Sequence, residues 1–468
     1  MSTSRPLSLR DPGARLALCV AGLVAITLVR VAWLGTLLVD GTGHPWSWGL
    51  LGLAWLVLGV GALRAFLAAL DRGTEPLRRL LAPALVLHVV AALALPYTSN
   101  DLFSNLAYGR MLRLGLDPYA LGPSALPAGD AFRALVSSNW RDTPSVYGPV
   151  LTALHAVAGL AGAVPWAMAI FKVIVLAVTL ATVLLAYAVC RKHVPAPLAP
   201  SAFVLFAWNP LLAHEISGQA HNDAVMLLGL TAFVWAALEE RELLAVLLLA
   251  LAFYAKFAVA PVLGLYLWYL ARRSPGRALI AGAMVAALGV ALFLPFWSGP
   301  STLAGPAAAI SADRPRVTRS FAEILYLPVS ILDPPRSFWV YRACWGVGTA
   351  GLAVLALRAL RRVRTVASVL HESLVFLLFY LLVAAPFVLP WYLTWLLPLT
   401  LTERDPRWRR VVALYTGLSL VAWCADVPVL QVAVVNTAVL MLARRWFFGP
   451  GQAAGEASEE ELLWRKSA

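Results

Sequence analysis

Charged residues are scarce in this 468-residue sequence. Asp, Glu, Lys and Arg together make up only 13% of the chain, whereas 61% of its residues are hydrophobic and its mean hydropathy is +0.78. Soluble domains carry about 25% charged residues, so the composition excludes an ordinary soluble protein. A helix that crosses a bilayer needs about 20 apolar residues, and such stretches recur from near residue 16 to residue 442. The composition therefore predicts a polytopic membrane protein.

Cysteine and lysine are scarce as well. The four cysteines, Cys19, Cys190, Cys344 and Cys424, lie in or beside apolar segments without any C-x-x-C spacing. This pattern favours buried thiols and excludes a disulfide framework or a cysteine metal site. The chain has four lysines against 33 arginines and a net charge of +13, but its basic residues gather in short runs between apolar segments. Such runs are typical of the cytoplasmic loops of membrane proteins, so we expect no nucleic-acid partner.

Seven basic runs predict how the chain threads the membrane. They lie around residues 5–15, 72–79, 191–192, 272–277, 358–364, 404–410 and 444–445. If all of them are cytoplasmic, the apolar segments before residue 97 cross three times and leave Asp101 outside. Residues 166–190 must then return the chain to the inside, so residues 149–164 cannot also cross. We therefore expect residues 97–165 to form one unit on the outer face.

Many of the apolar segments after residue 199 are short. Several contain only about 14 residues, roughly 21 Å of helix at 1.5 Å per residue, so we expect some of them to be half-helices packed around a cavity. The prediction is a single all-α membrane domain over residues 1–448, with about 12–14 transmembrane helices and large extracytoplasmic loops at 97–165 and 298–336. Residues 16–39 are too long an apolar run for a cleaved signal peptide, and residues 449–468 are expected to form a polar cytoplasmic tail.

The first polar group that stands out is a carboxylate at the edge of the membrane. Asp101 follows an apolar segment that ends near Pro96 and heads the first large outer loop. A carboxylate in this position is costly unless it has a function. Asn105 and Tyr108, at i+4 and i+7, fall on the same face of a helix as Asp101. The alternative is an amphipathic interfacial helix that Asp101 merely caps.

A second polar cluster lies on the same predicted side of the membrane. It consists of His214, Glu215, His221, Asn222 and Asp223. So many ionisable groups at a membrane face favour a functional site. One alternative is that Asn222 and Asp223 cap the helix that follows. Another is a zinc site formed by His214, Glu215 and His221, although the spacing matches no established zinc pattern.

Two further features accompany these clusters. Lys256 lies in the apolar stretch Tyr254-Ala255-Lys256-Phe257, where it either extends from a helix end towards water or binds a phosphate as a compact charge. Trp391 and Tyr392, in Pro390-Trp391-Tyr392, either belong to an interfacial aromatic belt or offer a ring on which a sugar stacks.

Taken in order, these segments resemble a family of membrane enzymes. The order is Asp101, then Tyr108-Gly109-Arg110 with Gly115-Leu116-Asp117-Pro118-Tyr119, Tyr147-Gly148-Pro149, Trp208-Asn209-Pro210 with His221-Asn222-Asp223, Tyr254-Ala255-Lys256-Phe257 and Pro390-Trp391-Tyr392. The set, spread over roughly residues 80 to 400, resembles the GT-C integral-membrane glycosyltransferases. It is most similar to the bacterial polyprenol-phosphate-mannose-dependent α-1,6-mannosyltransferases. No single motif is specific for this family, but the ordered set of motifs is.

The resemblance implies a reaction and its partners. The donor would be a polyprenyl phosphate carrying one sugar, most simply mannose, and the acceptor a glycan or a lipid-linked glycan. Transfer would take place on the outer face of the bacterial cytoplasmic membrane with inversion at the anomeric carbon. Asp101 matches the catalytic carboxylate of the family and would act as general base. The loop has a single Asp where some branches carry an acidic pair, so the sequence indicates no metal or other cofactor.

The other residues are assigned by the chemistry of the reaction. The phosphate leaving group needs fixed cations, for which the expected residues are Lys256, Arg314, Arg316 and Arg319. The expected sugar- and acceptor-binding residues are Asn105, Tyr108, Tyr147, His214, Glu215, His221, Asn222, Asp223, Trp391 and Tyr392. The alternative function is a transporter or flippase, whose binding charges would lie near the bilayer centre. Here the charges are predicted at the outer ends of helices instead.

Overall fold

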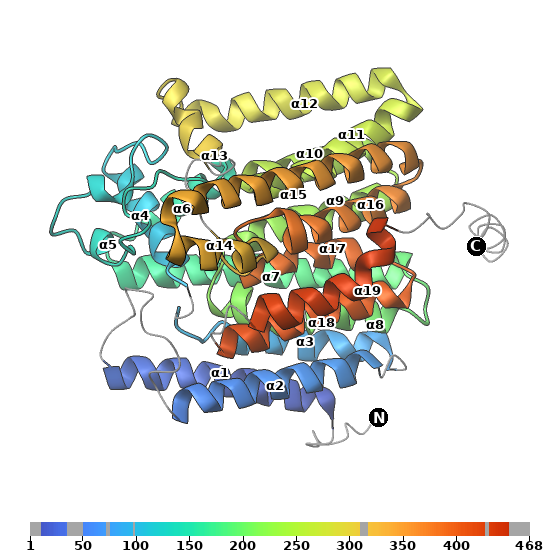
Figure 1. The fold of residues 1–468 in the computed structure, drawn as a ribbon, viewed down its shortest axis with the longest axis horizontal. Helices are drawn as coiled ribbons and strands as arrows, with labels where there is room; N and C mark the ends of the chain where they lie inside the picture. The colour runs from blue at the N-terminus through green and yellow to red at the C-terminus, as the bar shows by residue number, and fades with distance from the viewer. Residues whose placement is uncertain are drawn as a thin grey trace.

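The structure is a bundle of helices that run roughly side by side (Figure 1). The computed structural model describes residues 11–34, 50–71, 75–96, 99–308, 317–425 and 430–448. Within these ranges the regular structure is helical except for one isolated bridge between Thr318 and Phe387, which confirms the all-α class. Arg314, Arg316 and the predicted tail 449–468 lie outside the described residues.

Fewer helices than expected are long enough to cross a membrane by themselves. Six in the described ranges are long and apolar enough: α1 (Pro12–Leu34), α2 (Leu50–Asp71), α7 (Val164–His193), α12 (Pro275–Phe293), α15 (Pro334–Arg362) and α16 (Val366–Phe379) with its π-helical extension η7 (Tyr380–Ala384). A seventh span is formed if η3 (Leu212–Gly218) and α9 (Asp223–Leu238), which are bent by 119° at their junction, count as one. The described residues thus supply six or seven helices that are long enough to span, against the 12–14 transmembrane helices expected, because many apolar segments form short or broken helices.

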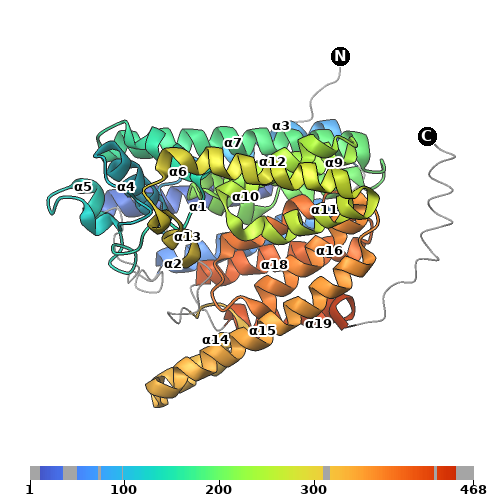
Figure 2. The same ribbon diagram turned by 90° about the horizontal axis from the view of Figure 1, so that it is seen from above.

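Further helices lie beside or between these spans. They are α3 (Leu77–Ala91), α8 (Ala199–Ala207), α10 (Glu242–Ala255), α11 (Ala260–Arg273), α14 (Phe321–Leu332), α17 (Leu397–Thr400), α18 (Pro406–Ala425) and α19 (Thr437–Phe448). Figure 2 shows α14 and the start of α15 projecting from the bundle. At the end of α14, Ile331 is 71% and Leu332 is 84% exposed. Such apolar surface is what a lipid-facing helix carries.

Basic residues gather at one end of the bundle, which we call the basic end. There α7 ends at His193, α9 ends at Leu238 and α10 begins at Glu242. Glu239 contacts Lys192 Nζ at 2.6 Å and His193 Nε2 at 2.7 Å. The opposite end carries α4 (Asp101–Arg113), α5 (Ala131–Ala134) and α6 (Pro149–Gly159), on the left of Figure 1. The predicted separation of these basic runs from the Asp101 loop is thus present in the fold.

Helices α4 and α6 pack backbone to backbone. A Cβ atom added at Gly109 would clash with the backbone oxygen of His155, and one at Gly159 would clash with the backbone oxygen of Gly109. Small residues allow this close approach between membrane-associated helices. The 11 residues of α6 extend only about 17 Å at 1.5 Å per residue. As expected for residues 149–164, α6 is too short to cross a hydrocarbon core of about 30 Å.

The two predicted outer loops contact each other. The second, residues 298–336, contributes η6 (Pro300–Leu303) and α13 (Ala304–Ala308), and η5 (Leu294–Phe296) leads into it. Ser298 Oγ donates a hydrogen bond to Asp117 of the first loop. Tyr119 packs against Phe293 and Phe296, with ring centroids 6.0 Å apart in both pairs. Residues distant in sequence thus join at the end of the bundle that carries α4.

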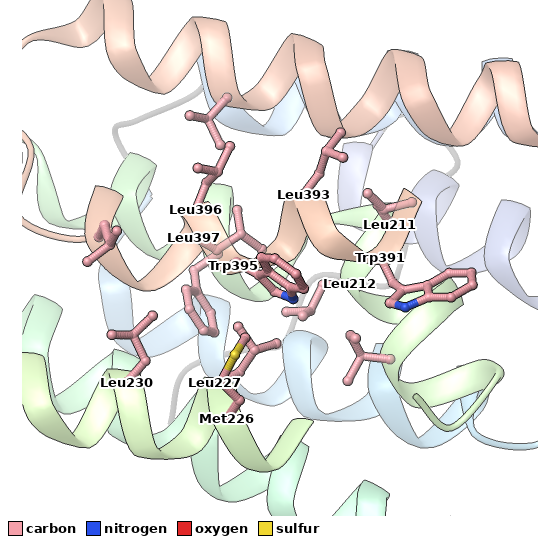
Figure 3. Close-up of a cluster of buried hydrophobic side chains, with 14 of the residues drawn as sticks. Leu211, Leu212, Met226, Leu227, Leu230, Trp391, Leu393, Trp395, Leu396 and Leu397 are labelled. Atoms are coloured by element: carbon pink, nitrogen blue, oxygen red, sulfur yellow. The ribbon is translucent and has the colours of Figure 1, made fainter. Parts of the chain in front are cut away.

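A buried apolar cluster fixes the bent pair η3–α9 against a later segment. Figure 3 shows Leu211 and Leu212 at the start of η3 together with Met226, Leu227 and Leu230 from α9. They pack beside Trp391, Leu393 and Trp395 of η8 (Pro390–Leu396). The cluster holds the aromatic side chains of η8 next to the turn between η3 and α9, where the polar residues lie.

Candidate active site

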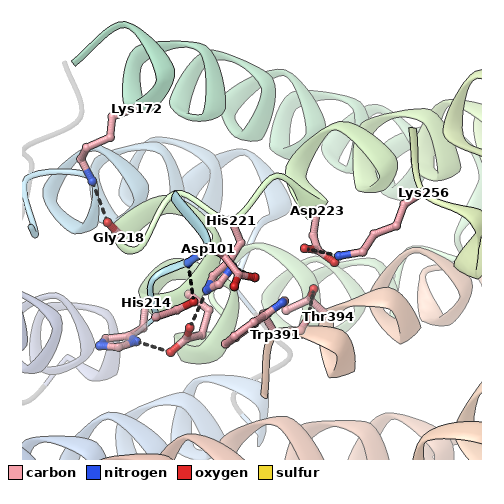
Figure 4. Close-up of polar contacts among 11 residues, drawn as sticks. Asp101, Lys172, His214, Gly218, His221, Asp223, Lys256, Trp391 and Thr394 are labelled. Atoms are coloured by element: carbon pink, nitrogen blue, oxygen red, sulfur yellow. Dashed lines mark hydrogen bonds and ion pairs between the residues drawn. The ribbon is translucent and has the colours of Figure 1, made fainter. Parts of the chain in front are cut away.

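Polar side chains from four segments meet at the end of the bundle opposite the basic end (Figure 4). The segments are the first turn of α4, η3 with the turn that follows it, the residue directly after α10, and η8. They supply Asp101, then the His214 to Asp223 cluster, Lys256, and the aromatic residues around Trp391. Two of the clusters predicted separately from the sequence therefore form one site.

The first feature of the site is a line of alternating carboxylates and imidazoles. His221 Nδ1 lies 3.7 Å from Asp101 Oδ2, and His221 Nε2 lies 3.2 Å from Glu215 Oε2. On the far side, His214 Nδ1 lies 2.9 Å from Glu215 Oε1. The Asp101 side chain is 29% exposed, His221 1% and Glu215 0%. Asp101 is therefore the member of this line that a substrate reaches first.

The depth of Glu215 and His214 changes their expected role. Both were predicted to bind sugar or acceptor, but both are buried behind His221. In this arrangement Glu215 and His214 are linked to Asp101 only through His221. The zinc alternative also gains no support, because among the described residues no group of three His, Cys, Asp or Glu side chains is arranged to hold a metal ion.

The backbone around His221 is held in an unusual conformation. Ala220 has a φ of +57°, in the left-handed region that residues with a Cβ rarely adopt. Lys172 Nζ donates to the carbonyl oxygen of Gly218 at 2.7 Å, and His88 Nδ1 lies 2.8 Å from Ser217 Oγ. Lys172 and His88 were not among the predicted site residues, although an ionisable residue inside an apolar segment is itself a signal.

Trp391 supports His221 from one side. The two rings are stacked, with centroids 3.7 Å apart and an interplanar angle of 21°. Trp391 is only 2% exposed, so the interfacial-belt alternative is wrong for it, and a sugar has at most its other face to stack on. Trp423 lies edge-on to Trp391 at 6.3 Å, and the guanidinium of Arg319 lies 4.2 Å from the centroid of Trp423. The indole rings of Trp423 and Trp391 thus lie between Arg319 and His221.

The second feature of the site is a buried ion pair inside an aromatic cage. Lys256 Nζ lies 2.7 Å from Asp223 Oδ2, and Trp395 Nε1 donates to Asp223 Oδ1 at 2.6 Å. The ammonium group also lies 5.2 Å from the ring centroid of Tyr392 and 6.0 Å from that of Tyr147. The snorkelling alternative for Lys256 is therefore wrong. The capping alternative for Asp101 is also wrong, because Asp101 is the first residue of α4, after Asn100, and its own backbone N–H donates to Ser99 Oγ at 3.1 Å.

Amide groups tie the elements of the site together. Asn222 Nδ2 donates to Asn105 Oδ1 at 3.2 Å and joins the turn before α9 to α4. The Asn222 side chain makes no capping hydrogen bond at the start of α9, so the capping alternative is wrong for Asn222 as well. The backbone N–H of Gly148 donates to Ala255 at 3.1 Å, which places Tyr147 beside the end of α10. The Tyr108 hydroxyl donates to the carbonyl oxygen of Thr143 at 2.9 Å.

Burial sets the protonation chemistry of the accessible groups. Burial raises the pKa of the Asp101 carboxyl above its ordinary value, and the nearby His221 and Lys256 partly oppose this rise. A carboxylate with a raised pKa is a stronger base than an ordinary Asp. Burial also raises the pKa of the Tyr147 hydroxyl well above its usual range, so this group stays protonated and remains a hydrogen-bond donor.

Comparison with known sequences identifies the family. Residues 14–272, more than half of the chain, match the family described as α-(1→6)-mannopyranosyltransferase, N-terminal domain. The chain belongs to this family. The match includes Asp101, Asp223 and Lys256 but ends before Arg319 and Trp391. The resemblance seen in the sequence motifs is thereby confirmed.

Individual members of the family are similar over part of their length. An α-(1→6)-mannopyranosyltransferase A of Mycobacterium tuberculosis is 29% identical over 265 residues, which cover 55% of this chain and 49% of the relative. A second mannopyranosyltransferase of that organism is 35% identical over 38% of this chain and 29% of its own length. The Corynebacterium glutamicum mannopyranosyltransferase A is 29% identical over a stretch that covers 51% of this chain and 46% of the relative. The chain thus spans about half or less of the length of these relatives.

Proposed function

We propose that the protein transfers mannose from a polyprenyl-phosphate-linked donor to a glycan or glycolipid acceptor and forms an α-(1→6) bond. The observation that carries the proposal is the position of Asp101. It is a partly exposed carboxylate with a raised pKa at the head of α4, 3.7 Å from His221 and next to the Lys256–Asp223 pair. The relatives are α-(1→6)-mannopyranosyltransferases, and the sugar and the linkage of the proposal are taken from them.

In this mechanism Asp101 is the general base. The 6-hydroxyl oxygen of the acceptor forms a bond to the anomeric carbon from the face opposite the phosphate, and its proton passes to the Asp101 carboxylate. The bond between the anomeric carbon and the phosphate oxygen breaks, and its electron pair stays on the phosphate. Attack from the opposite face inverts the anomeric centre. The products are the extended glycan and a polyprenyl phosphate, which the membrane retains.

The phosphate places a demand on the cations of the site. Lys256 is already paired with Asp223, so the negative charge that develops on the leaving group needs further positive charge. We assign Arg319, whose guanidinium lies behind Trp423 and Trp391, to this role by its charge. We assign Arg314 and Arg316 to the same role from their place in the sequence. We assign Tyr147 and Tyr392, whose ring centroids lie 6.0 and 5.2 Å from Lys256 Nζ, to the sugar and acceptor, together with Asn105.

A transfer assay tests the proposal. The purified protein in lipid nanodiscs receives polyprenyl-phosphate-mannose and mannose-containing glycolipids, and the linkage formed is read by NMR. We expect an α-(1→6) product with this donor and none with a nucleotide sugar. Asp101→Asn should lower turnover by about 100-fold or more. Asp142→Asn is the control, because Asp142 is an exposed carboxylate of the same outer unit.

Two results would count against the proposal. Near-normal turnover by Asp101→Asn would show that the carboxylate is not the base. Movement of a sugar lipid across a vesicle membrane, without any new glycosidic bond, would favour the transporter alternative instead.

We also propose that the Asp101 end faces the outside of the bacterial cytoplasmic membrane, since the basic end carries the residues typical of the inner face. Two glycines test this, because nothing lies within 4 Å of a Cβ atom added at either one. Gly129→Cys lies in the outer unit and Gly276→Cys at the basic end, each made in a cysteine-free background. An impermeant thiol reagent should label the first and spare the second in intact cells. The reverse pattern would refute the orientation.

A further inference from the structure

A hollow at the basic end is formed by one face of α15. Its volume is about 490 Å³, and the residues that line it are Val354, Leu357, Arg358, Arg361 and Arg362. They follow the i, i+3, i+4, i+7 and i+8 spacing of a single helix face. Arg272 of α11 donates to the carbonyl oxygen of Leu360 at 3.1 Å. The next residue, Arg273, pairs with Glu242 at the start of α10, so the hollow lies beside the basic loops.

The hollow carries more positive than negative charge. Glu372 of α16 is buried and pairs with two of the arginines, Arg358 at 3.4 Å and Arg362 at 3.6 Å. Arg361 is exposed, and no carboxylate in the described ranges pairs with it. Three guanidinium groups thus share one carboxylate. An anion bound in the hollow would balance the remaining positive charge.

The other part of the same helix face is apolar. Val354 is 65% and Leu357 is 60% exposed, in a helix that is long and apolar enough to cross a membrane. Leu357 precedes Arg361 by about one helical turn, roughly 6 Å at 1.5 Å per residue. Trp268 of α11 is 39% exposed and donates its Nε1–H to the carbonyl oxygen of Leu360 at 2.7 Å. Tryptophan is enriched at the level of the lipid headgroups, so the arginines lie at that level and the apolar residues lie next to the acyl chains.

We propose that the hollow binds an anionic phospholipid, whose phosphate contacts Arg361 and Arg362 and whose acyl chain lies along Leu357 and Val354. Basic pockets between transmembrane helices on the cytoplasmic side suit such headgroups. A zwitterionic lipid offers no net charge to the excess of guanidinium groups. The chain's own acidic tail, with Glu456, Glu459, Glu460 and Glu461, would match the charge but not the apolar part of the face. A phospholipid matches both.

The test uses the full-length protein, freed of lipid in a neutral detergent. Native mass spectrometry follows binding as phosphatidylglycerol, or phosphatidylcholine with the same acyl chains, is added. We expect phosphatidylglycerol to bind more tightly. Arg361→Gln should weaken its binding about fivefold, the contribution of one arginine near an anionic lipid surface. Equal binding of the two lipids, or binding that Arg361→Gln leaves unchanged, would overturn the proposal.

A matched control separates a built site from general attraction to positive charge. Arg277 is also an exposed arginine of the basic end, and the nearby Leu279 and Ile280 are 76% and 57% exposed. However, Arg277 pairs with Glu242 at 2.8 Å. Arg277→Gln should therefore leave the affinity for phosphatidylglycerol unchanged. A loss equal to that of Arg361→Gln would show that the lipid follows charge alone, which would refute the site.

Two further variants test which occupant the hollow takes. Leu357→Ala should weaken phosphatidylglycerol binding about twofold or more, because contacts with the acyl chain are lost. An unchanged affinity would mean that only a phosphate group is recognised, and no lipid site would remain. In the second variant the four glutamates of the tail are replaced by glutamine in the full-length chain, and we expect no change. Binding that became several-fold tighter would assign the hollow to the tail instead. These measurements need no sugar donor or acceptor, so they stand apart from the transfer assay.

Discussion

The two ends of the bundle use charge in opposite ways. At the basic end, Glu242 pairs with Arg273 and Arg277, whose side chains are 54% and 63% exposed. At the other end, Asp223 is 1% exposed and pairs with Lys256 inside an aromatic cage. Exposed pairs contribute about 0–1 kcal/mol each, whereas breaking a buried pair costs about 3–5 kcal/mol.

The two ends differ in how far water reaches their charges. Water solvates the charges at the basic end, so their pairs are replaceable. The charges around Asp101 lie among apolar helices, where each one requires a fixed partner. We therefore expect substitutions at the two ends to differ sharply in effect.

The largest effect is expected at the buried pair. Lys256→Met removes the cation, leaves Asp223 buried without it, and should both destabilise the fold by about 3–5 kcal/mol and weaken donor binding. The double variant Lys256→Met/Asp223→Asn restores charge balance and should recover most of the stability but not the donor affinity. Thermal unfolding and binding of polyprenyl-phosphate-mannose measure the two properties. If donor affinity returned together with stability, Lys256 would have only a structural role.

A smaller but clear effect is expected where α4 meets α6. Gly109→Ala places a methyl group against the backbone of His155, so α4 must move and should take Asp101 with it. We expect a loss of about 1–3 kcal/mol in stability and a lower transfer rate. Gly129→Ala is the control, because nothing lies within 4 Å of that position. Equal behaviour of the two variants would show that the contact between α4 and α6 does not position Asp101.

The pH profile gives a graded effect. Only the ionised form of Asp101 accepts a proton, and burial raises the pKa of this carboxyl above its ordinary 3.8. Transfer should therefore decline, as the pH falls, at a higher pH than an ordinary Asp would allow. Initial rates measured from pH 4 to 8, corrected for stability, check this. The small residual rate of Asp101→Asn should lack this decline; if the variant showed it, another group would be its source.

The smallest effect is expected at the basic end. Glu242→Gln removes the partner of two exposed arginines and should change the stability by no more than about 1 kcal/mol, with transfer unchanged. Thermal unfolding and the transfer assay again provide the measurements. A loss as large as that of Lys256→Met would abolish the contrast between the two ends.

Some of this could be predicted from the sequence because the signals were local. A carboxylate placed just after an apolar segment identified Asp101. The positive-inside rule required that residues 149–164 not cross, and α6 ends after only 11 residues. The all-α class followed from composition. Each of these inferences used neighbouring residues or a simple count.

The rest depended on contacts that neighbouring residues do not reveal. The hydrogen bond from Trp395 to Asp223 joins residues that are 172 positions apart in the sequence. His88 and Ser217, which also lie within hydrogen-bond distance, are 129 positions apart. The stacking of His221 on Trp391 is of the same kind. No periodicity in the sequence predicts that η3 is a π-helix or that Ala220 adopts a positive φ. For this reason His214 and Glu215 were assigned to the sugar, although they lie behind His221.

The aromatic support of the site has a consequence for hybrid proteins. The family match ends at residue 272, yet the indoles of Trp391 and Trp395 hold His221 and Asp223 in place. A chimera that joined the first 272 residues of this chain to the second half of a relative would depend on that relative for the rings that contact His221 and Asp223. An exchange that keeps these contacts intact therefore carries η8 along with the N-terminal half.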